Sequence, residues 1–464
     1  MKVFGSSGTR GVANIELTPS FALRVAAAAG TVWNADRVAV GRDTRTTGRM
    51  FADAAASGLA STGANVDRLG IIPTPGLQAY AEREGVPGLM ITASHNPPEY
   101  NGIKLIGDDG VELSKHQLER VEGTILGEKF DKVAWNETGT TRVVDGARDA
   151  YVEELLDSVD REQIAAANLT VALDPGHGAG SLTSPDFFRE LGCEVVTVNA
   201  QPDGHFPGRD PEPIPENLAD LGRLVRASGA DIGIAHDGDA DRAIFYDEKG
   251  RYIEGDATLA ALAEAELTPD DATVSAVNVS QRLVDLTTEI GASLELTPVG
   301  STNIITRIEE LQRGDVHVPV AGEGNGGVLF PDYRLARDGA YTAAKFLELL
   351  ADRTASEVVN RFEGYENVRT KIHYDSDAEY DAMLHAAEQQ AEKASAELST
   401  IDGFRLDYGD AWVLVRPSGT EPLIRIYAEA RGIHRAQELA DGMYDALIAA
   451  KEEAIEAEKE EATQ

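Results

Sequence analysis

The chain has 464 residues and a formal net charge of −37. This length exceeds one hydrophobic core, because domains hold roughly 100 to 200 residues, so we expect three or four domains. No uninterrupted apolar run approaches the roughly 20 residues that span a bilayer, and Met1 to Phe4 lead into glycine and serine, unlike a signal peptide. These features argue against a membrane protein and predict a soluble, cytoplasmic one.

The negative charge is spread along the chain. Of its 42 basic residues, 31 are arginine and only 11 are lysine. Self-repulsion on this scale is screened in strong salt, where the Debye length falls to about 3 Å at 1 M, so we expect a halophilic host. A tail that binds a basic partner is the alternative, but only residues 452–461 form an acidic block. The charge also argues against a nucleic-acid partner.

A strand, a turn and a helix follow one another three times. The expected strands are residues 38–40, 169–173 and 272–278, and the helices that follow are near 51–59, 186–191 and 280–290. Apolar strands that alternate with helices predict α/β domains. The single cysteine, Cys193, lies in the apolar segment 191–196 and is expected to be a small core residue.

The pattern changes after Gly364. A charged, alanine-rich helix is expected over 377–397, then strands at 404–408, 412–415 and 424–429, and a last helix over 434–451. This order predicts an α+β domain. The final segment, 452–464, has little apolar face, so we expect it to be frayed or disordered. The predicted domains are therefore 1–150, 151–252 and 253–364, all α/β, and 365–464.

Ser94 lies on a turn directly after an apolar strand. The segment Ile91-Thr92-Ala93-Ser94-His95-Asn96-Pro97-Pro98 leaves regular structure at Asn-Pro-Pro, which exposes a hydroxyl as a nucleophile requires. Taken alone, this octapeptide fits an ordinary Ser/Asn turn better than a nucleophile. His95 is adjacent to Ser94 and makes no catalytic triad, because neighbouring residues of an extended chain point in opposite directions. Lys104 is close enough in sequence to fold back on the turn.

The segment Asp237-Gly238-Asp239-Ala240-Asp241-Arg242 is the more specific signal. Three carboxylates at alternate positions of a turn can converge on one hard cation such as Mg²⁺ or Ca²⁺. An EF-hand fits in part, because Glu248 is at the twelfth position, but Arg242 takes the place of the required glycine and the flanks are predicted strands. A solvated turn is the third interpretation. Arg242 favours a phosphate ligand beside the cation.

Two further loops can bind anions. Arg416-Pro417-Ser418-Gly419-Thr420-Glu421-Pro422, with Arg425 beyond it, offers hydroxyls, backbone N–H groups and two guanidinium groups to a phosphate monoester. A decorated surface turn is the alternative. The segment Gly5-Ser6-Ser7-Gly8-Thr9-Arg10-Gly11 is a second small-residue loop with the same potential.

Two glycine-rich segments remain. In Ala321-Gly322-Glu323-Gly324-Asn325-Gly326-Gly327, Glu323 and Asn325 could bind sugar hydroxyls, although a glycine-rich hairpin would look the same. The segment 174–180 has the spacing G-x-G-x-G, which does not match the dinucleotide fingerprint G-x-G-x-x-G. Its His177 is expected to be a turn residue.

Together and in this order, these segments resemble the α-D-phosphohexomutase superfamily, which includes phosphoglucomutase, phosphomannomutase and phosphoglucosamine mutase. The resemblance covers nearly the whole chain. Residues 92–97 match the family's phosphoserine loop (here the serine loop), 237–242 its magnesium loop (the metal loop), 322–327 its sugar loop and 416–422 its phosphate loop. The resemblance implies four domains in a heart-shaped arrangement, three related α/β domains with mixed sheets and a C-terminal α+β domain, each contributing one loop to a cleft.

The resemblance also implies roles for these residues. Phosphorylated Ser94 would be the resting enzyme, and Mg²⁺ would be held by Asp237, Asp239 and Asp241 together with the phosphorylated Ser94. The other implied catalytic residues are Arg10, His95, Lys104 and Arg242, with either Lys104 or His95 transferring the proton. The implied substrate-binding residues are Glu323, Asn325, Arg416, Ser418, Gly419, Thr420 and Arg425. A hexose 1,6-bisphosphate would form, turn over in the site and serve as an activator.

The substrate expected from the resemblance is a small phosphosugar, bound by a monomer or homodimer. Asn325 and Gly327 depart from the commonest bacterial sugar loop and are similar to the archaeal branch. This favours phosphoglucosamine mutase, with phosphomannomutase or phosphoglucomutase as the alternative. A sugar phosphatase, and a calcium- or nucleotide-binding protein without enzyme activity, are the hypotheses from other classes.

Overall fold

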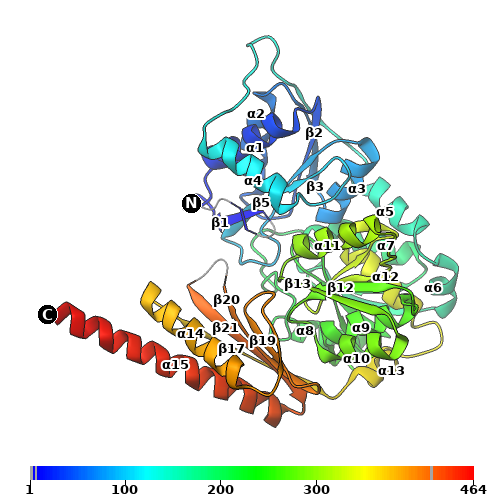
Figure 1. Cartoon of the computed structure of the whole chain (residues 1–464). Helices are drawn as coiled ribbons and strands as arrows, with labels where there is room; N and C mark the ends of the chain where they lie inside the picture. The colour runs from blue at the N-terminus through cyan, green and yellow to red at the C-terminus, as the bar shows by residue number, and fades with distance from the viewer. Residues whose placement is uncertain (1–3, 6–7, 419–421, 464) are drawn as a thin grey trace. The chain divides into compact units, whose positions relative to one another are not determined.

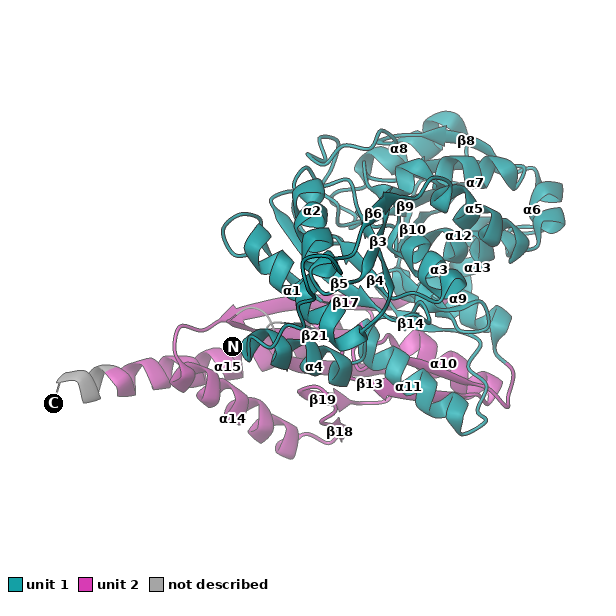
Figure 2. Ribbon diagram, turned by 90° about the horizontal axis from the view of Figure 1, so that it is seen from above, with its two compact units in different colours: residues 1–267, 301–361 teal, residues 268–300, 362–464 magenta. Residues whose placement is uncertain are grey.

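The computed structural model of the protein describes residues 4–5, 8–418 and 422–463, with side chains up to residue 458. The chain divides into two compact units (Figure 2). Unit 1 contains residues 1–267 and 301–361, and unit 2 contains residues 268–300 and 362–464.

The first sheet of unit 1 has six strands in the order β1-β5-β4-β2-β3-β6. These strands are β1 (Thr9–Val12), β2 (Arg37–Arg42), β3 (Asn65–Ile71), β4 (Gly88–Ile91), β5 (Tyr100–Ile106) and β6 (Thr141–Val143). Strand β2 runs parallel to β3 and β4, whereas β5 is antiparallel to both β4 and β1. The sheet is therefore mixed, with a parallel centre.

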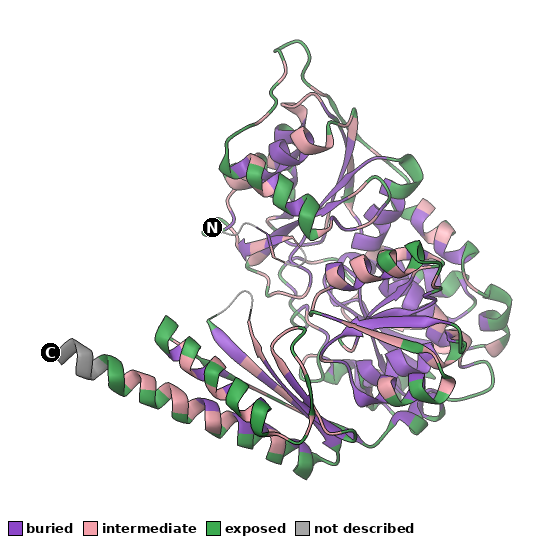
Figure 3. Cartoon of the chain, in the orientation of Figure 1, coloured by how far each residue is buried: buried purple, intermediate pink, exposed green. Residues whose placement is uncertain are grey.

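Helices supply the apolar partners of this sheet. They are α1 (Pro19–Trp33), α2 (Gly48–Ala60), α3 (Thr74–Glu84) and α4 (Lys115–Leu126). Helices α1, α2 and α4 share one apolar core with the strands, and α3 belongs to a second core. The central strands are buried (Figure 3), which explains why β2 and β4 read as short, uninterrupted apolar runs.

The parallel centre brings three turns to one edge of the sheet. Strands β2, β3 and β4 all end there, and they are followed by the turn at Asp43, by Thr74 and by Ser94. The carboxyl ends of parallel strands are the usual place for a ligand site in α/β proteins. This edge is therefore the expected place for a ligand site in the first sheet.

The second sheet of unit 1 has the order β11-β10-β9-β7-β8. Its strands are β7 (Thr170–Asp174), β8 (Glu194–Thr197), β9 (Ile232–His236), β10 (Ala243–Tyr246) and β11 (Tyr252–Ile253), and its helices include α5 (Ala147–Asp157), α6 (Arg161–Ala167), α7 (Ser184–Glu190) and α8 (Ala219–Ser228). Strand β7 is parallel to β8 and β9, and β10 is antiparallel to β9. The metal loop connects β9 to β10.

The rest of unit 1 is built on a three-stranded antiparallel meander. The strands of the meander are β14 (Ala321–Glu323), β15 (Gly327–Phe330) and β16 (Arg334–Arg337). The helices of this part are α9 (Gly255–Glu266), α11 (Ser301–Arg313), α12 (Gly339–Glu348) and α13 (Ala355–Val359). The sugar loop is the tight connection between β14 and β15. Asp338 caps α12 by accepting hydrogen bonds from the backbone N–H groups of Ala340 and Tyr341.

Unit 2 combines a parallel strand pair with an antiparallel sheet. The pair is β12 (Ala272–Ala276) and β13 (Ser293–Thr297), joined by α10 (Gln281–Ile290). The sheet has the order β17-β21-β20-β19-β18, from β17 (Tyr365–His373), β18 (Glu397–Ser399), β19 (Phe404–Asp407), β20 (Ala411–Pro417) and β21 (Leu423–Arg431). Helices α14 (Asp377–Lys393) and α15 (Ile433–Thr463) lie side by side against it (Figure 1).

These elements confirm the predicted α/β class with a C-terminal α+β domain. The prediction for the last segment is wrong, because α15 continues to Thr463. Glutamate, alanine and lysine are strong helix formers, and extending a helix that is already packed requires no new nucleation. Within the described part of the chain, no helix is both long and apolar enough to cross a membrane.

Candidate active site

Ser94 occupies the turn after β4 in a left-handed backbone conformation, with a φ of 53°. This conformation is uncommon for a residue other than glycine and persists only where surrounding contacts enforce it. The Ser94 N–H donates to Thr92 Oγ1 at 2.9 Å, and Ser94 Oγ donates to Asp237 Oδ2 at 2.7 Å. The hydroxyl is thus aimed at the metal loop.

Arg45 holds the serine loop in place through hydrogen bonds to its backbone. Its guanidinium, which is fully buried, pairs with Asp43 and donates to four backbone carbonyls, those of Ser94, Asn96, Pro97 and Tyr100. Asp43 in turn accepts a hydrogen bond from Thr92 Oγ1 at 2.6 Å. The turn after β2 therefore fixes the turn after β4.

The metal loop brings three buried carboxylates together. Asp237, Asp239 and Asp241 each offer an oxygen within 4.8 Å of the other two. Thr74 Oγ1 donates to Asp239 at 2.6 Å, and Lys104 Nζ donates to both Asp239 and Asp241. The loop lies between two antiparallel strands, so it is not a helix–loop–helix calcium site.

These carboxylates fit a divalent cation. Asp239 Oδ1 and Asp241 Oδ1 are buried and have no hydrogen-bond partner among the residues that the structure describes. Burial and the neighbouring charges of Asp241 and Asp239 raise the pKa of Asp237 well above its usual range. Unpaired buried oxygens and crowded carboxylates are what a hard cation neutralises, and Mg²⁺ prefers such oxygen ligands.

Two backbone features give the metal loop its shape. A Cβ at Gly238 would lie 2.5 Å from the carbonyl oxygen of Ser94, so glycine is required for the close approach of the two loops. His236, which precedes the loop, donates from Nδ1 to the carbonyl of Arg242 at 2.9 Å and thereby joins the two ends of the loop. Arg209 anchors the same region by donating to the carbonyls of His236 and Asp174.

The predicted cations lie in unit 1 near these loops. Lys104 is buried on Asp239 and Asp241, and Arg242 Nε is 3.8 Å from Asp241 and 4.0 Å from Asp237. The Nε of Arg242 makes no hydrogen bond within the described residues. Arg10, on β1, donates to Asn96 Oδ1 at 2.7 Å. Both loops are therefore lined by groups that attract phosphate.

His95 Nδ1 lies 3.5 Å from Ser94 Oγ. Burial, together with the nearby charges of Arg242 and Arg10, lowers the pKa of His95 to about 2. For Lys104, burial opposes the charge, but Asp239, Asp241 and Glu112 outweigh it and raise the pKa above its usual range. The two candidates for proton transfer thus differ in charge as well as in position.

The sugar loop is joined to the metal loop through Arg337. The Arg337 guanidinium donates to Asp241 Oδ2 at 2.6 Å and lies 3.9 Å from Glu323 Oε2. Glu323 is buried at the end of β14, and Asn325 is exposed at the tip of the loop, where its Oδ1 accepts the N–H of Gly327. A sugar hydroxyl at Glu323 would therefore lie near the metal ligands.

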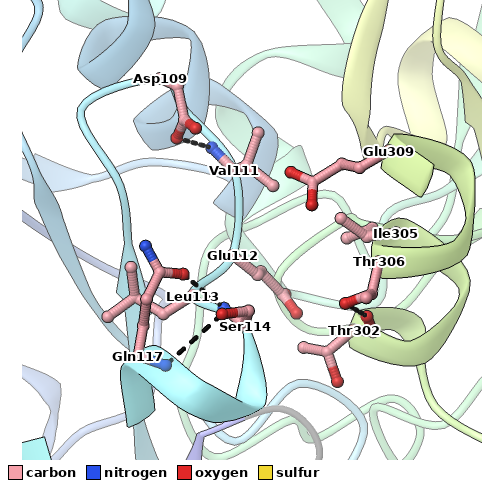
Figure 4. Close-up of a pocket in the computed structure, with 10 residues that line it drawn as sticks. All are labelled: Asp109, Val111, Glu112, Leu113, Ser114, Gln117, Thr302, Ile305, Thr306 and Glu309. Atoms are coloured by element: carbon pink, nitrogen blue, oxygen red, sulfur yellow. Dashed lines mark hydrogen bonds between the residues drawn. The ribbon is translucent and has the colours of Figure 1, made fainter. Parts of the chain in front are cut away.

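A pocket of about 230 Å³ opens between the turn after β5 and helix α11 (Figure 4). Its walls carry hydroxyls, amides and carboxylates, contributed by Asp109, Glu112, Ser114, Gln117, Thr302, Thr306 and Glu309. Glu112 accepts a hydrogen bond from Ser301 Oγ at 3.1 Å and lies 3.7 Å from Lys104 Nζ. Glu112 in the pocket wall thus forms an ion pair with Lys104, which binds the metal loop.

The phosphate loop belongs to unit 2. Arg416 on β20 and Arg425 on β21 are direct cross-strand partners, and Arg416 Nε donates to Asp402 at 2.5 Å. The N–H of Ser418 donates to the carbonyl of Leu423. Gly419 and Thr420 lie outside the described residues. The structure therefore places two guanidinium groups on one sheet at this loop.

Comparison with known proteins identifies the family. Models of the phosphoglucomutase/phosphomannomutase family match in order: α/β/α domain I at residues 1–132, domain II at 149–250, domain III at 254–365 and the C-terminal domain at 367–446. The chain belongs to the phosphoglucomutase/phosphomannomutase family. It is a phosphohexomutase, an isomerase that transfers phosphate within its substrate, and the resemblance to the α-D-phosphohexomutase superfamily is confirmed.

Relatives and a solved structure agree over the whole length of this phosphohexomutase. "Phosphoglucomutase/phosphomannomutase" of Thermococcus kodakarensis is 44% identical and covers 94% of this chain and 96% of its own. "Probable phosphoglucosamine mutase" of Methanopyrus kandleri is 40% identical and covers 98% and 100%. A Burkholderia thailandensis phosphoglucomutase/phosphomannomutase family protein has a TM-score of 0.84 at 28% identity, covering 97% of each chain.

Four residues of the phosphohexomutase site were not predicted from the sequence, namely Arg45, Thr74, Glu112 and Arg337. Arg45, Thr74 and Arg337 contact predicted residues in distant parts of the chain, whereas Glu112 lies 3.7 Å from Lys104, which is close to it in the sequence. The position of Arg45 and Thr74 directly after parallel strands was the available signal. His177 is a hydrogen-bonded turn residue as predicted, since it contacts the carbonyl of Gln201 and the N–H of Gly208.

Proposed function

We propose that this phosphohexomutase interconverts a hexose 6-phosphate and a hexose 1-phosphate through a phosphorylated Ser94. The observation that carries the proposal is the 2.7 Å hydrogen bond from Ser94 Oγ to Asp237, which is 143 residues away in the sequence. It aims a strained, buried hydroxyl at three converging carboxylates, two of which keep one oxygen without a hydrogen bond among the described residues. A structural serine would need neither the strain nor the carboxylates.

Asp237, Asp239 and Asp241 would hold Mg²⁺, which supplies charge stabilisation to a phosphoryl oxygen when it is bound. The protein's own groups orient the rest. Arg242, whose Nε makes no hydrogen bond within the described residues, can bind the phosphoryl oxygens, and Glu323 can accept a hydrogen bond from a sugar hydroxyl. Arg45 keeps Ser94 in place by binding the carbonyls of its loop.

In the first transfer, the bond between Ser94 Oγ and phosphorus breaks and a bond from the sugar hydroxyl oxygen to phosphorus forms. The hydroxyl proton passes to a base, and Ser94 Oγ takes up a proton. The resulting bisphosphate turns over, and its other phosphate returns to Ser94 by the reverse steps. His95, whose Nδ1 lies 3.5 Å from Ser94 Oγ, and Lys104, which binds Asp239 and Asp241, are the two candidates for exchanging these protons.

The phosphoserine is tested by intact mass and by substitution. We expect a fraction of the protein to carry one extra phosphate, located on the peptide that contains Ser94, and we expect Ser94→Ala to lose both this phosphate and mutase turnover. Trace hexose 1,6-bisphosphate should activate the wild type. Release of free phosphate in place of an isomer would indicate a phosphatase, and unchanged turnover of Ser94→Ala would contradict the mechanism.

For the sugar, we propose glucosamine 6-phosphate. The support is the name of the Methanopyrus relative, whereas the Thermococcus relative is named for glucose and mannose phosphates. These sugars differ at C2, where an amino group replaces a hydroxyl or the hydroxyl is inverted. Relative kcat/KM on glucosamine, mannose and glucose 6-phosphates decides among them, and a preference for either neutral sugar would refute the assignment.

We also propose that the protein works in concentrated salt, because the chain has 79 acidic residues and only 42 basic ones. Their repulsion is screened within a Debye length of about 3 Å at 1 M salt. Turnover and Tm should therefore both rise between about 0.1 M and about 2 M KCl. A maximum at low salt would contradict this proposal without affecting the proposed chemistry.

A further inference from the structure

Two of the three carboxylates of the metal loop, Asp239 and Asp241, share an asymmetry. Asp239 Oδ2 accepts hydrogen bonds from Thr74 Oγ1 at 2.6 Å and from Lys104 Nζ at 2.9 Å. Asp241 Oδ2 accepts them from Arg337 at 2.6 Å and from Lys104 Nζ at 3.0 Å. The Oδ1 atom of each is buried and accepts no hydrogen bond within the described part of the chain, and Arg242 Nε lies 3.8 Å from that of Asp241. Each carboxylate thus has one oxygen held and one oxygen available.

The three donors come from separate elements, which makes the restraint rigid. Thr74 begins α3, Lys104 lies in β5 and Arg337 ends β16, and all three side chains are buried. Rotating either carboxylate to present both oxygens to a cation would leave these donors unpaired in the interior. Leaving a donor buried and unpaired is unfavourable, and it is more so when the donor is charged.

We infer that Thr74, Lys104 and Arg337 are positioning residues that make the metal loop select Mg²⁺ over Ca²⁺. The inference rests on the proposed function in that the loop binds a divalent cation. Ca²⁺ takes six to eight oxygen ligands and often uses both oxygens of a carboxylate, whereas Mg²⁺ takes six in a compact octahedron. A carboxylate confined to one oxygen therefore suits the smaller ion.

The appropriate readout is the ratio of two affinities. Removing the charge of Arg337 alters the electrostatic attraction for any dication. A change in the affinity for one ion alone would therefore not separate the effect of charge from the effect of carboxylate orientation. Mg²⁺ and Ca²⁺ have equal charge, and this contribution cancels in the ratio of the Ca²⁺ Kd to the Mg²⁺ Kd. The ratio also requires no turnover, so it is independent of the catalytic steps.

The experiment titrates MgCl₂ and CaCl₂ into the full-length protein by calorimetry. The variants are Thr74→Val, which is nearly isosteric and changes no charge, Arg337→Met, and the double variant. Arg334→Met is the matched control. Arg334 begins the same strand and is similarly buried, with exposed fractions of 9% for Arg334 and 7% for Arg337, but its partners are Glu82 and Glu154.

The ratio should fall at least about tenfold in the double variant, because removing groups that orient metal ligands typically changes metal affinity by about 10- to 100-fold. It should fall by less in each single variant and should not change in Arg334→Met. A ratio in Thr74→Val and Arg337→Met equal to that of the wild type, or an equal fall in Arg334→Met, would overturn the inference. A wild type that binds neither ion would instead refute the metal site of the proposed function.

Discussion

Replacing Arg45 with lysine tests how the serine loop is held. Arg45 makes five side-chain hydrogen bonds, one to Asp43 and four to backbone carbonyls. Lysine has three donors, so at least two of these bonds are lost. At about 1.5 kcal/mol for a hydrogen bond from a charged group, the loop should lose about 3 kcal/mol of local stability. Domains are stable by about 5 to 15 kcal/mol, so the variant should still fold.

Hydrogen exchange measures this loss where it occurs. The N–H groups of Ser94, Asn96 and Tyr100 are all hydrogen-bonded within the serine loop and exchange only when it opens. A loss of about 3 kcal/mol corresponds to roughly 100-fold faster exchange of the peptide that contains them. Turnover should fall by a similar factor, because a displacement of about 1 Å at a reacting group can cost about 100-fold.

Arg282→Lys is the control for a general loss of stability. Arg282 is also buried, at 5% exposure, and donates to two backbone carbonyls, but it belongs to unit 2 and is far from Ser94 in the sequence. Exchange at the serine loop should be the same in this variant as in the wild type. Unchanged protection of residues 94–100 in Arg45→Lys, with the protein folded, would refute the role assigned to Arg45.

Three further predictions follow from single contacts. Gly238→Ala should lower turnover about 100-fold in a folded protein, because the added Cβ would meet the Ser94 carbonyl at 2.5 Å; wild-type kinetics would contradict this. Burial raises the pKa of the Cys193 thiol to about 11. Iodoacetamide at pH 8 should therefore alkylate Cys193 at least about 100-fold more slowly than free cysteine. The free energy of unfolding should also decline as the pH rises from about 8.5 toward the pKa of the buried thiol. Deleting residues 452–464 should shift Tm by less than about 3 °C, since no described side chain among 452–458 is buried, and a larger shift by calorimetry would show that the helix end packs.

The sequence by itself identified the groups that are adjacent in the chain. Asp237, Asp239 and Asp241 lie on one turn, so their convergence is a local property that a loop between two strands already dictates. Ser94 was visible for the same reason, because an apolar strand ends just before it. The class of each domain also followed from periodicity, since buried strands and amphipathic helices leave different patterns.

The sequence was less informative where long-range packing or helix extension decides. The helix end after Lys451 was predicted to fray because apolar periodicity was the criterion, yet α15 continues to Thr463 from a packed helix through residues of high helix propensity. The assignment of Ser94 as a nucleophile likewise depended on the order of the other motifs. Taken alone, its octapeptide is an ordinary turn.

Only the tertiary structure showed which groups restrain the site. Thr74 binds Asp239 across 165 residues, Arg337 binds Asp241 across 96, and Arg45 binds the carbonyl of Ser94 across 49. Nothing in the sequence near these residues identifies their partners, and Arg337 is one of 31 arginines. Their roles arise because parallel strands end at one edge and distant turns meet there. The chain order thus identifies the reacting groups, whereas folding determines which oxygen of Asp239 and of Asp241 has no hydrogen bond among the described residues.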